Sequence, residues 1–183
     1  MTKVAVVVGS LRKGSYSRMI AKATFGLAAG MECEIVEIGA LPLYDPDLDE
    51  GKPPAPWLAF RESIRRADAV LFVTPEYNRS VPGGLKNAID VGSRPYGKSV
   101  WSGKPAAVVS VSPGALAAFG ANQHLRQSFV FLDMPVLQQP EAYIGGVAKL
   151  VDAGGALVND DTRAFLRKFM EAFAAWIARV GRP

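Results

Sequence analysis

An almost uninterrupted apolar run near the start of the chain, followed at once by a polar turn, most constrains the fold. Residues 4–8 read VAVVV, and a β-branched run of this kind is typical of a strand buried on both faces, as in a parallel sheet. Gly9 ends the run, and residues 10–18 bring hydroxyls, cationic side chains and Gly14 to the place where a helix begins. Free backbone N–H groups at a helix start, beside cations, are suited to a phosphate. The sequence therefore predicts a parallel α/β sheet with a phosphate cradle after its first strand.

The spacing within this turn excludes two common phosphate loops. Gly9 and Gly14 have the spacing of a nucleoside triphosphate loop, but Ser15 stands where that loop needs lysine. Leu11 stands at the second glycine of the dinucleotide fingerprint. A phosphatase of similar architecture would need a cysteine nucleophile here, and the turn has none. We interpret the turn as the cradle of a phosphorylated cofactor, although Ser15 or Ser17 alone could equally be a helix cap.

Composition limits the class of protein. A chain of 183 residues suits one domain, residues 1–183, with a sizeable core, and its 49% hydrophobic and 21% charged residues are typical of a soluble globular protein. We find no signal-peptide pattern and no stretch that approaches a membrane span, so we expect no membrane partner. The single cysteine, Cys33, excludes an internal disulfide and is expected to be a small buried side chain at a strand start. Together these features predict a cytoplasmic protein.

The net charge of +4 does not predict a nucleic-acid partner, because the basic residues are dispersed and form no block with interleaved aromatics. A modest positive balance fits the attraction of phosphorylated small molecules.

Strand and helix patterns alternate five times along the chain without an internal repeat. We expect strands at 4–8, 33–38, 69–74, 106–111 and, more weakly, 134–137, with helices at about 19–30, 57–67, 82–93, 116–129 and from 160. This alternation is typical of an open, doubly wound parallel sheet with helices on both faces. With the flavodoxin-like strand order 2-1-3-4-5, the loops after strands one, three and four would meet at one edge, where ligands bind.

Two further clusters are interpreted as structural. The segment 41–56 is rich in proline and acidic residues and could suggest a metal site, but its prolines and lack of ligand geometry favour a solvated surface loop. The aromatic stripe of the last helix is interpreted as core; it consists of Phe165, Phe169, Phe173 and Trp176.

Three strings carry a resemblance to a known family. GSLRKGSYSR at 9–18, TPEYNRSVPGGLKNAID at 74–90 and a Ser-x-Gly loop at 112–114 resemble the NAD(P)H-dependent FMN reductase family, which includes bacterial quinone, azo-dye and chromate reductases. LRQ at 125–127 and FLD at 131–133 extend the resemblance over nearly the whole chain. It implies an enzyme that passes a hydride from NAD(P)H through bound FMN to quinones or other small acceptors, such as azo compounds and chromate.

The chain departs from the family pattern at two positions. Asn is common in the family at the position of Ser17, and serine there still offers a hydrogen bond to phosphate. An aromatic residue, often Trp, is common at the position of Val91, which leaves open how the third helix packs, including against a partner subunit.

The resemblance also implies which residues hold the cofactor. The FMN phosphate would be held by Ser10, Arg12, Ser15, Ser17 and Arg18. The isoalloxazine would be lined, largely through backbone amides, by Pro75, Glu76, Tyr77 and Asn78, and flanked by Ser112 and Gly114. Arg79 is either a surface charge or reaches the phosphate of the nicotinamide nucleotide. We expect no catalytic side chain and no metal, because the cofactor carries the chemistry.

Several charged and polar residues near these strings have structural interpretations. The Glu76 carboxylate would oppose the negative charge of reduced flavin, so we expect it to act through its backbone or to point away. His124 is interpreted as a surface or interface residue. Lys86, Asn87 and Asp90 are expected to order the third helix.

The charge and the loops of the chain bear on two other functions and on the oligomeric state. An electron-carrier flavodoxin is expected to be strongly acidic, whereas this chain is net positive. A regulatory or interaction domain that had lost the site would not keep the loops intact. The Gly83-Gly84 pair and the apolar third helix suggest a homodimer or homotetramer in which a neighbouring subunit helps to cover the flavin.

Overall fold

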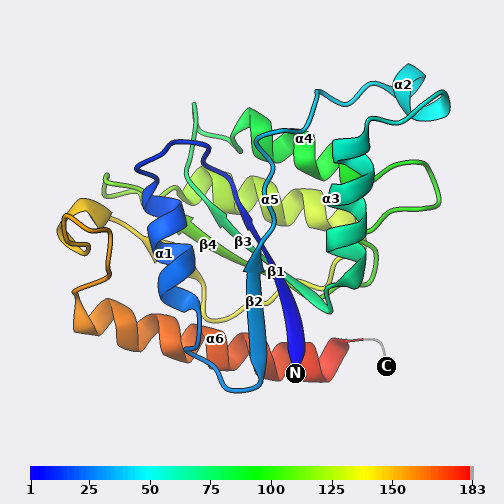
Figure 1. Ribbon diagram of the computed structural model, residues 1–183. Helices are drawn as coiled ribbons and strands as arrows, with labels where there is room; N and C mark the ends of the chain where they lie inside the picture. The colour runs from blue at the N-terminus through cyan, green and yellow to red at the C-terminus, as the bar shows by residue number, and fades with distance from the viewer. Residues whose placement is uncertain (182–183) are drawn as a thin grey trace.

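The computed structural model describes residues 1–181 and contains one sheet of five parallel strands, with helices on both faces (Figure 1). The strands are β1 (Thr2–Val8), β2 (Met31–Ile35), β3 (Ala69–Thr74), β4 (Ala106–Val111) and β5 (Ala142–Ile144). Their order is β2-β1-β3-β4-β5, and every neighbouring pair is parallel. The expected flavodoxin-like fold and strand order are therefore confirmed.

The helices form two layers that enclose the sheet. One face carries α1 (Tyr16–Thr24) and α6 (Asp160–Val180), and the other carries α3 (Ala55–Arg66), α4 (Gly83–Gly92) and α5 (Phe119–Phe131) (Figure 1). A short helix, α2 (Pro46–Glu50), precedes α3, and a 3-10 turn, η1 (Val147–Lys149), follows β5. None of the helices in the described part of the chain has the length and apolarity needed to cross a bilayer.

The central strands read as continuous apolar runs because both of their faces are buried. Along β1, Val4, Val6 and Val8 pack into the core beneath α1 and α6, whereas Ala5 and Val7 pack into the core beneath α3, α4 and α5. The aromatic stripe of α6 joins the first of these cores, as expected: Phe169 and Phe173 are buried there, and Phe165 and Trp176 pack against it.

The prediction of a fifth strand at 134–137 is wrong. That segment runs beside the start of β4, where it forms one isolated bridge between Val136 and Ala106. Pro135 has no N–H to donate and cannot continue a ladder. The chain then turns, and β5 pairs with the second half of β4, Ala142 lying opposite Val109.

Boundaries also differ at the first crossover. Helix α1 ends at Thr24, six residues before Gly30, and Gly26 then takes a positive φ of 73°. Strand β2 begins at Met31, so Cys33 lies in the middle of this edge strand and is half-buried rather than buried. Partial burial raises the pKa of the Cys33 thiol.

The segment 41–56 is not solvated throughout, contrary to expectation. The Asp49 carboxylate is buried and accepts two hydrogen bonds from the Arg61 guanidinium, at 2.8 and 2.7 Å. Arg61 Nε also donates to the carbonyl of Val91 at 2.9 Å, which ties the segment to α4. Hydrogen bonding from Arg61 lowers the pKa of Asp49 below its ordinary value. Among residues 1–181 no group of three or more potential metal ligands is present.

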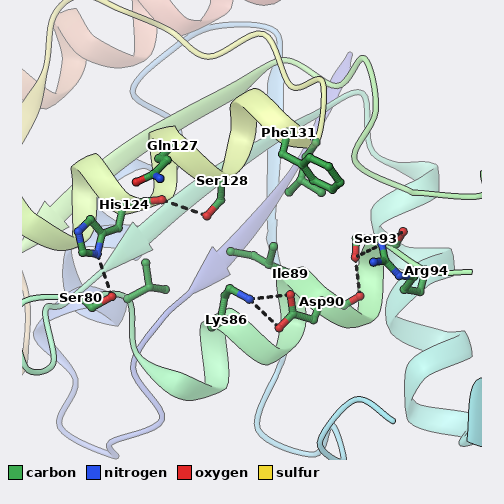
Figure 2. A pocket seen from close by; sticks show the side chains of 12 residues that line it. Ser80, Lys86, Ile89, Asp90, Ser93, Arg94, His124, Gln127, Ser128 and Phe131 are labelled. Atoms are coloured by element: carbon green, nitrogen blue, oxygen red, sulfur yellow. Dashed lines mark hydrogen bonds and ion pairs between the residues drawn. The ribbon is translucent and has the colours of Figure 1, made fainter. Parts of the chain in front are cut away.

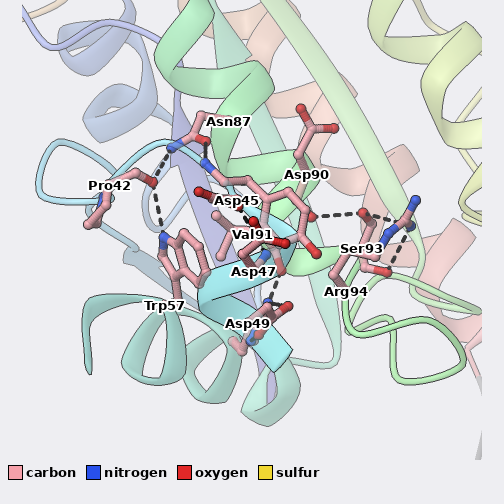
Figure 3. A network of polar contacts seen from close by, with 12 residues as sticks. Pro42, Asp45, Asp47, Asp49, Trp57, Asn87, Asp90, Val91, Ser93 and Arg94 are labelled. Carbon is pink, nitrogen blue, oxygen red and sulfur yellow. Dashed lines mark hydrogen bonds and ion pairs between the residues drawn. The ribbon is translucent and has the colours of Figure 1, made fainter. Parts of the chain in front are cut away.

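A second set of bonds holds the start of this segment. The Asn87 side chain accepts from the backbone N–H of Tyr44 at 2.8 Å and donates to the carbonyl of Pro42 at 2.9 Å (Figure 3). Trp57 Nε1 donates to the same carbonyl at 3.0 Å. Asn87 therefore orders α4 against its surroundings, as expected. Val91 is fully buried within its own chain, which removes the possibility that it packs against a partner subunit.

Candidate active site

The loops after β1, β3 and β4 meet at the carboxyl edge of the sheet, because the strands that carry them are neighbours. In the register, Val8 lies opposite Val73 and Thr74 lies opposite Ser110. The first two loops are in contact, since a Cβ added at Gly9 would lie 2.8 Å from Thr74 Oγ1 and 3.2 Å from Pro75 Cδ. The convergence expected from connectivity is confirmed.

The first loop combines buried serines with free backbone donors. Ser10, Ser15 and Ser17 are buried, and Ser15 is the N-cap of α1, its Oγ accepting from the N–H of Arg18 at 3.1 Å. Within the described chain, the backbone N–H groups of residues 11–14 have no protein acceptor. Arg12 is exposed and forms no ion pair with the described residues. Unpaired N–H groups, a helix N-terminus and a free guanidinium fit a phosphate.

Arg18 differs from Arg12 because it already has an anionic partner. Its guanidinium donates to both carboxylate oxygens of Glu37, at 2.7 and 2.6 Å. Their hydrogen bonding lowers the pKa of Glu37 and raises that of Arg18. Sequence reasoning missed Glu37, although it follows β2 closely, and β2 is the neighbour of β1.

The second loop contains a tight two-residue turn. Tyr77 and Ser80 exchange two backbone hydrogen bonds of 3.0 Å, and Asn78 and Arg79 between them have φ values of 50° and 64°. Positive φ at both central residues defines a type I′ turn. The Tyr77 side chain is exposed beside it. The turn thus presents backbone amides and an aromatic ring at the edge where the three loops meet.

Glu76 sits in this loop, and its carboxylate is directed toward the first turn of α5. One carboxylate oxygen pairs with Arg79 at 3.0 Å and the other accepts from the N–H of Ala121 at 3.2 Å.

The third loop is folded on itself and on β5. Ser112 Oγ accepts from the N–H of Gly114 at 3.0 Å, and the N–H of Ser112 donates to Ile144 at 2.9 Å. Ala117 and Ala118 both adopt positive φ, so α5 begins at Phe119 and not at residue 116 as expected.

Sequence reasoning did not single out Phe119, the first residue of α5, which directly follows the third loop. Its ring is exposed and lies 5.5 Å from that of Tyr143, which stands on β5 beside the third loop. An aromatic residue just after a run of small residues was the available signal.

Comparison with known proteins identifies the family. The family model described as NADPH-dependent FMN reductase matches residues 2–149. The chain belongs to the NADPH-dependent FMN reductase family. A quinone reductase of Pseudomonas putida is 66% identical over 175 residues, which cover 95% of this chain and 94% of that protein. A 2-hydroxy-1,4-benzoquinone reductase of Burkholderia sp. is 47% identical, with 96% of each chain covered.

A solved structure agrees with this assignment. FerB of Paracoccus denitrificans, a flavoenzyme NAD(P)H:(acceptor) oxidoreductase, matches with a TM-score of 0.92 and 42% identity over the whole of both chains. Family membership confirms that the protein is an oxidoreductase with FMN as cofactor and NAD(P)H as hydride donor. An electron carrier without its own NAD(P)H oxidation is not favoured.

A groove of about 560 Å³ runs between α4 and α5 from the end of the second loop. Figure 2 shows Ser80 and His124 at one end, where Ser80 Oγ lies 2.9 Å from His124 Nδ1. His124 is exposed, in keeping with its interpretation as a surface or interface residue. Lys86 and Asp90 form an ion pair of 2.8 Å along α4, again the ordering role expected of them.

Proposed function

We propose that this protein is an NAD(P)H-dependent, FMN-containing reductase that transfers a hydride from nicotinamide through bound FMN to quinones, with azo compounds and chromate as further acceptors. The observation that carries the proposal is the meeting of three cofactor-type loops at one sheet edge in a member of this family. Quinones are proposed as the acceptor class because relatives at 66% and 47% identity are named quinone and benzoquinone reductases.

The first loop is proposed to hold the FMN phosphate. Buried hydroxyls of Ser10, Ser15 and Ser17, together with the free N–H groups of residues 11–14, supply hydrogen-bond donors. Arg12 supplies the uncommitted positive charge, while Arg18 contributes from beside Glu37, which already neutralises much of its charge.

The second and third loops are proposed to hold the isoalloxazine. Pro75, Glu76, Tyr77 and Asn78 would line it with backbone amides and one aromatic face, and Ser112 and Gly114 would flank it. Arg79 is proposed to reach the phosphate of the nicotinamide nucleotide, because its side chain is 73% exposed even while paired with Glu76. Bound FMN supplies the hydride chemistry, whereas these residues bind, orient and exclude water, and none is assigned as a catalytic acid or base.

We also propose the domain organisation, the cellular location and the oligomeric state of the protein. Residues 1–183 would form one FMN-binding domain in a cytoplasmic protein, in keeping with one free cysteine. The buried apolar face of α4 packs within its own chain, so support for a homodimer or homotetramer comes instead from the exposed end of α5. There Val130 and Phe131 are 83% and 76% exposed, and Phe131 lines the α4–α5 groove.

The test starts with the purified protein. It should be yellow, bind FMN stoichiometrically, and oxidise NAD(P)H with a quinone in a reaction that depends on FMN. Anaerobic NAD(P)H should reduce the bound flavin with no partner protein, whereas a carrier would stay oxidised. Quinone-dependent NAD(P)H oxidation that is indifferent to FMN would contradict the proposal.

A further inference from the structure

Helix α5 begins without a cap of its own. The N-cap position is Ala118, which has no side-chain acceptor, and the first turn contains no acidic residue. The first N–H groups of a helix have no intrahelical partner, and an N-cap side chain normally accepts from the N–H two or three positions on. The N–H three positions after Ala118 belongs to Ala121.

The missing acceptor comes from the second loop. Glu76 Oε2 accepts from the Ala121 N–H at 3.2 Å, although 45 residues separate the two in sequence. The Glu76 side chain is only 11% exposed, and its other oxygen pairs with Arg79 inside the type I′ turn. A carboxylate at this place also interacts favourably with the positive end of the helix dipole.

Gly120 makes this close approach possible. A Cβ added at Gly120 would lie 2.9 Å from Glu76 Oε2 and 2.9 Å from the carbonyl oxygen of Arg79. Any larger residue would push the 75–80 loop off the first turn of α5. The loop at 112–118 leads directly into that turn, so a displacement of the turn would also move the end of this loop.

We propose that Glu76 is a positioning residue that caps α5 from another loop and thereby holds the 75–80 and 112–118 loops in one fixed arrangement around the flavin. The part concerning the flavin rests on the proposed function. Arg79 and the helix terminus together offset the negative charge of Glu76, which suits a carboxylate close to a cofactor that becomes negative on reduction.

The test compares Glu76→Ala, Glu76→Gln and Gly120→Ala with a charge-matched control, Glu171→Ala, on the exposed side of α6. Amide hydrogen exchange of Ala121 is followed by NMR in the apoprotein, and the dissociation constant of FMN is measured by fluorescence quenching. Glu76→Gln serves as the rescue variant, because its side-chain oxygen can still accept from Ala121.

We expect Glu76→Ala to speed exchange at Ala121 and to raise the dissociation constant of FMN about fivefold, equivalent to the ~1 kcal/mol typical of an N-cap. Glu76→Gln should keep most of the protection and of the affinity. Gly120→Ala should weaken FMN binding with Glu76 still present, and Glu171→Ala should change neither readout.

Unchanged exchange at Ala121 in Glu76→Ala would overturn the cap. Faster exchange with unaltered FMN affinity in both Glu76→Ala and Gly120→Ala would overturn the coupling of the loops. Wild-type protein that binds no FMN would overturn the proposed function and the flavin part of this proposal, while Ala121 exchange would still decide the cap.

Discussion

Gly9 is the residue at which the contact between the first two loops can be tested by adding a single methyl group. In Gly9→Ala the new Cβ would lie 2.8 Å from Thr74 Oγ1, 3.0 Å from Leu85 Cδ2 and 3.2 Å from Pro75 Cδ. The backbone cannot simply move away, because the Gly9 N–H donates to the carbonyl of Val73 at 2.9 Å. The methyl group therefore has to displace β3 and its loop, or strain β1.

Overpacking of this kind costs about 1–3 kcal/mol. If β1 absorbs the strain, urea denaturation should show that loss in the free energy of unfolding. If the loops separate instead, the dissociation constant of FMN should rise about fivefold to about a hundredfold, since ~1.4 kcal/mol is a factor of ten. Adding Thr74→Ala removes the shortest contact and should recover part of the loss, measured as a coupling energy in a double-mutant cycle.

Gly83→Ala is the matched control, because a Cβ there meets nothing within 4 Å and lies in the first turn of α4. Its stability should be unchanged or raised by up to ~1 kcal/mol. A Gly9→Ala protein with unaltered unfolding and unaltered FMN affinity would refute the contact between the loops after β1 and β3.

Three further variants test other parts of the account. Arg61→Ala should lose about 3–5 kcal/mol of stability in urea, because it leaves the buried Asp49 carboxylate without its partner. Since folding lowers the pKa of Asp49, the ion pair should stabilise the wild type fully above the ordinary pKa of 3.8 and less as the pH falls below it. A wild type whose free energy of unfolding does not fall in acid would count against the pair. Arg12→Ala should weaken FMN binding by about tenfold to a hundredfold, the equivalent of a charged hydrogen bond of ~1.5–3 kcal/mol, while riboflavin, which lacks the phosphate, should bind as before; an equal loss for both flavins would place Arg12 elsewhere. Phe131→Glu should convert an oligomer to monomers in size-exclusion with light scattering, while Leu58→Glu, at an exposed position of α3, should not. A wild type that is only monomeric would refute the oligomer.

The sequence predicted the fold well where strands are buried on both faces. Strands at 69–74 and 106–111 appear with the expected bounds, because a run of apolar residues has few alternatives at the centre of a parallel sheet. The bounds of the two edge strands were predicted less accurately, because β2 alternates in burial and β5 has only three residues. The apolar segment 134–137 was wrongly predicted as a strand, because a run of apolar residues does not reveal that Pro135 lacks the backbone N–H that a strand ladder needs.

The meeting of the three loops at one sheet edge could be predicted from the sequence, whereas the partners of their side chains could not. The switch-point rule placed the three loops from strand order alone. Pairings such as Arg18 with Glu37 and Glu76 with Ala121 join residues 19 and 45 positions apart in the sequence. No local sequence pattern indicates partners that are so far apart. Asp49 looked like one of several surface acids, and only Arg61, twelve residues later on a helix face, makes its burial possible.

The central claim is that the loops after β1, β3 and β4 form one FMN site. Amide hydrogen exchange of the apoprotein, with and without FMN, tests it most directly. We predict that FMN slows exchange in three separate segments, residues 10–18, 75–80 and 112–115, with little change along the α4–α5 groove. Protection confined to one of these segments, or centred on that groove, would contradict the account.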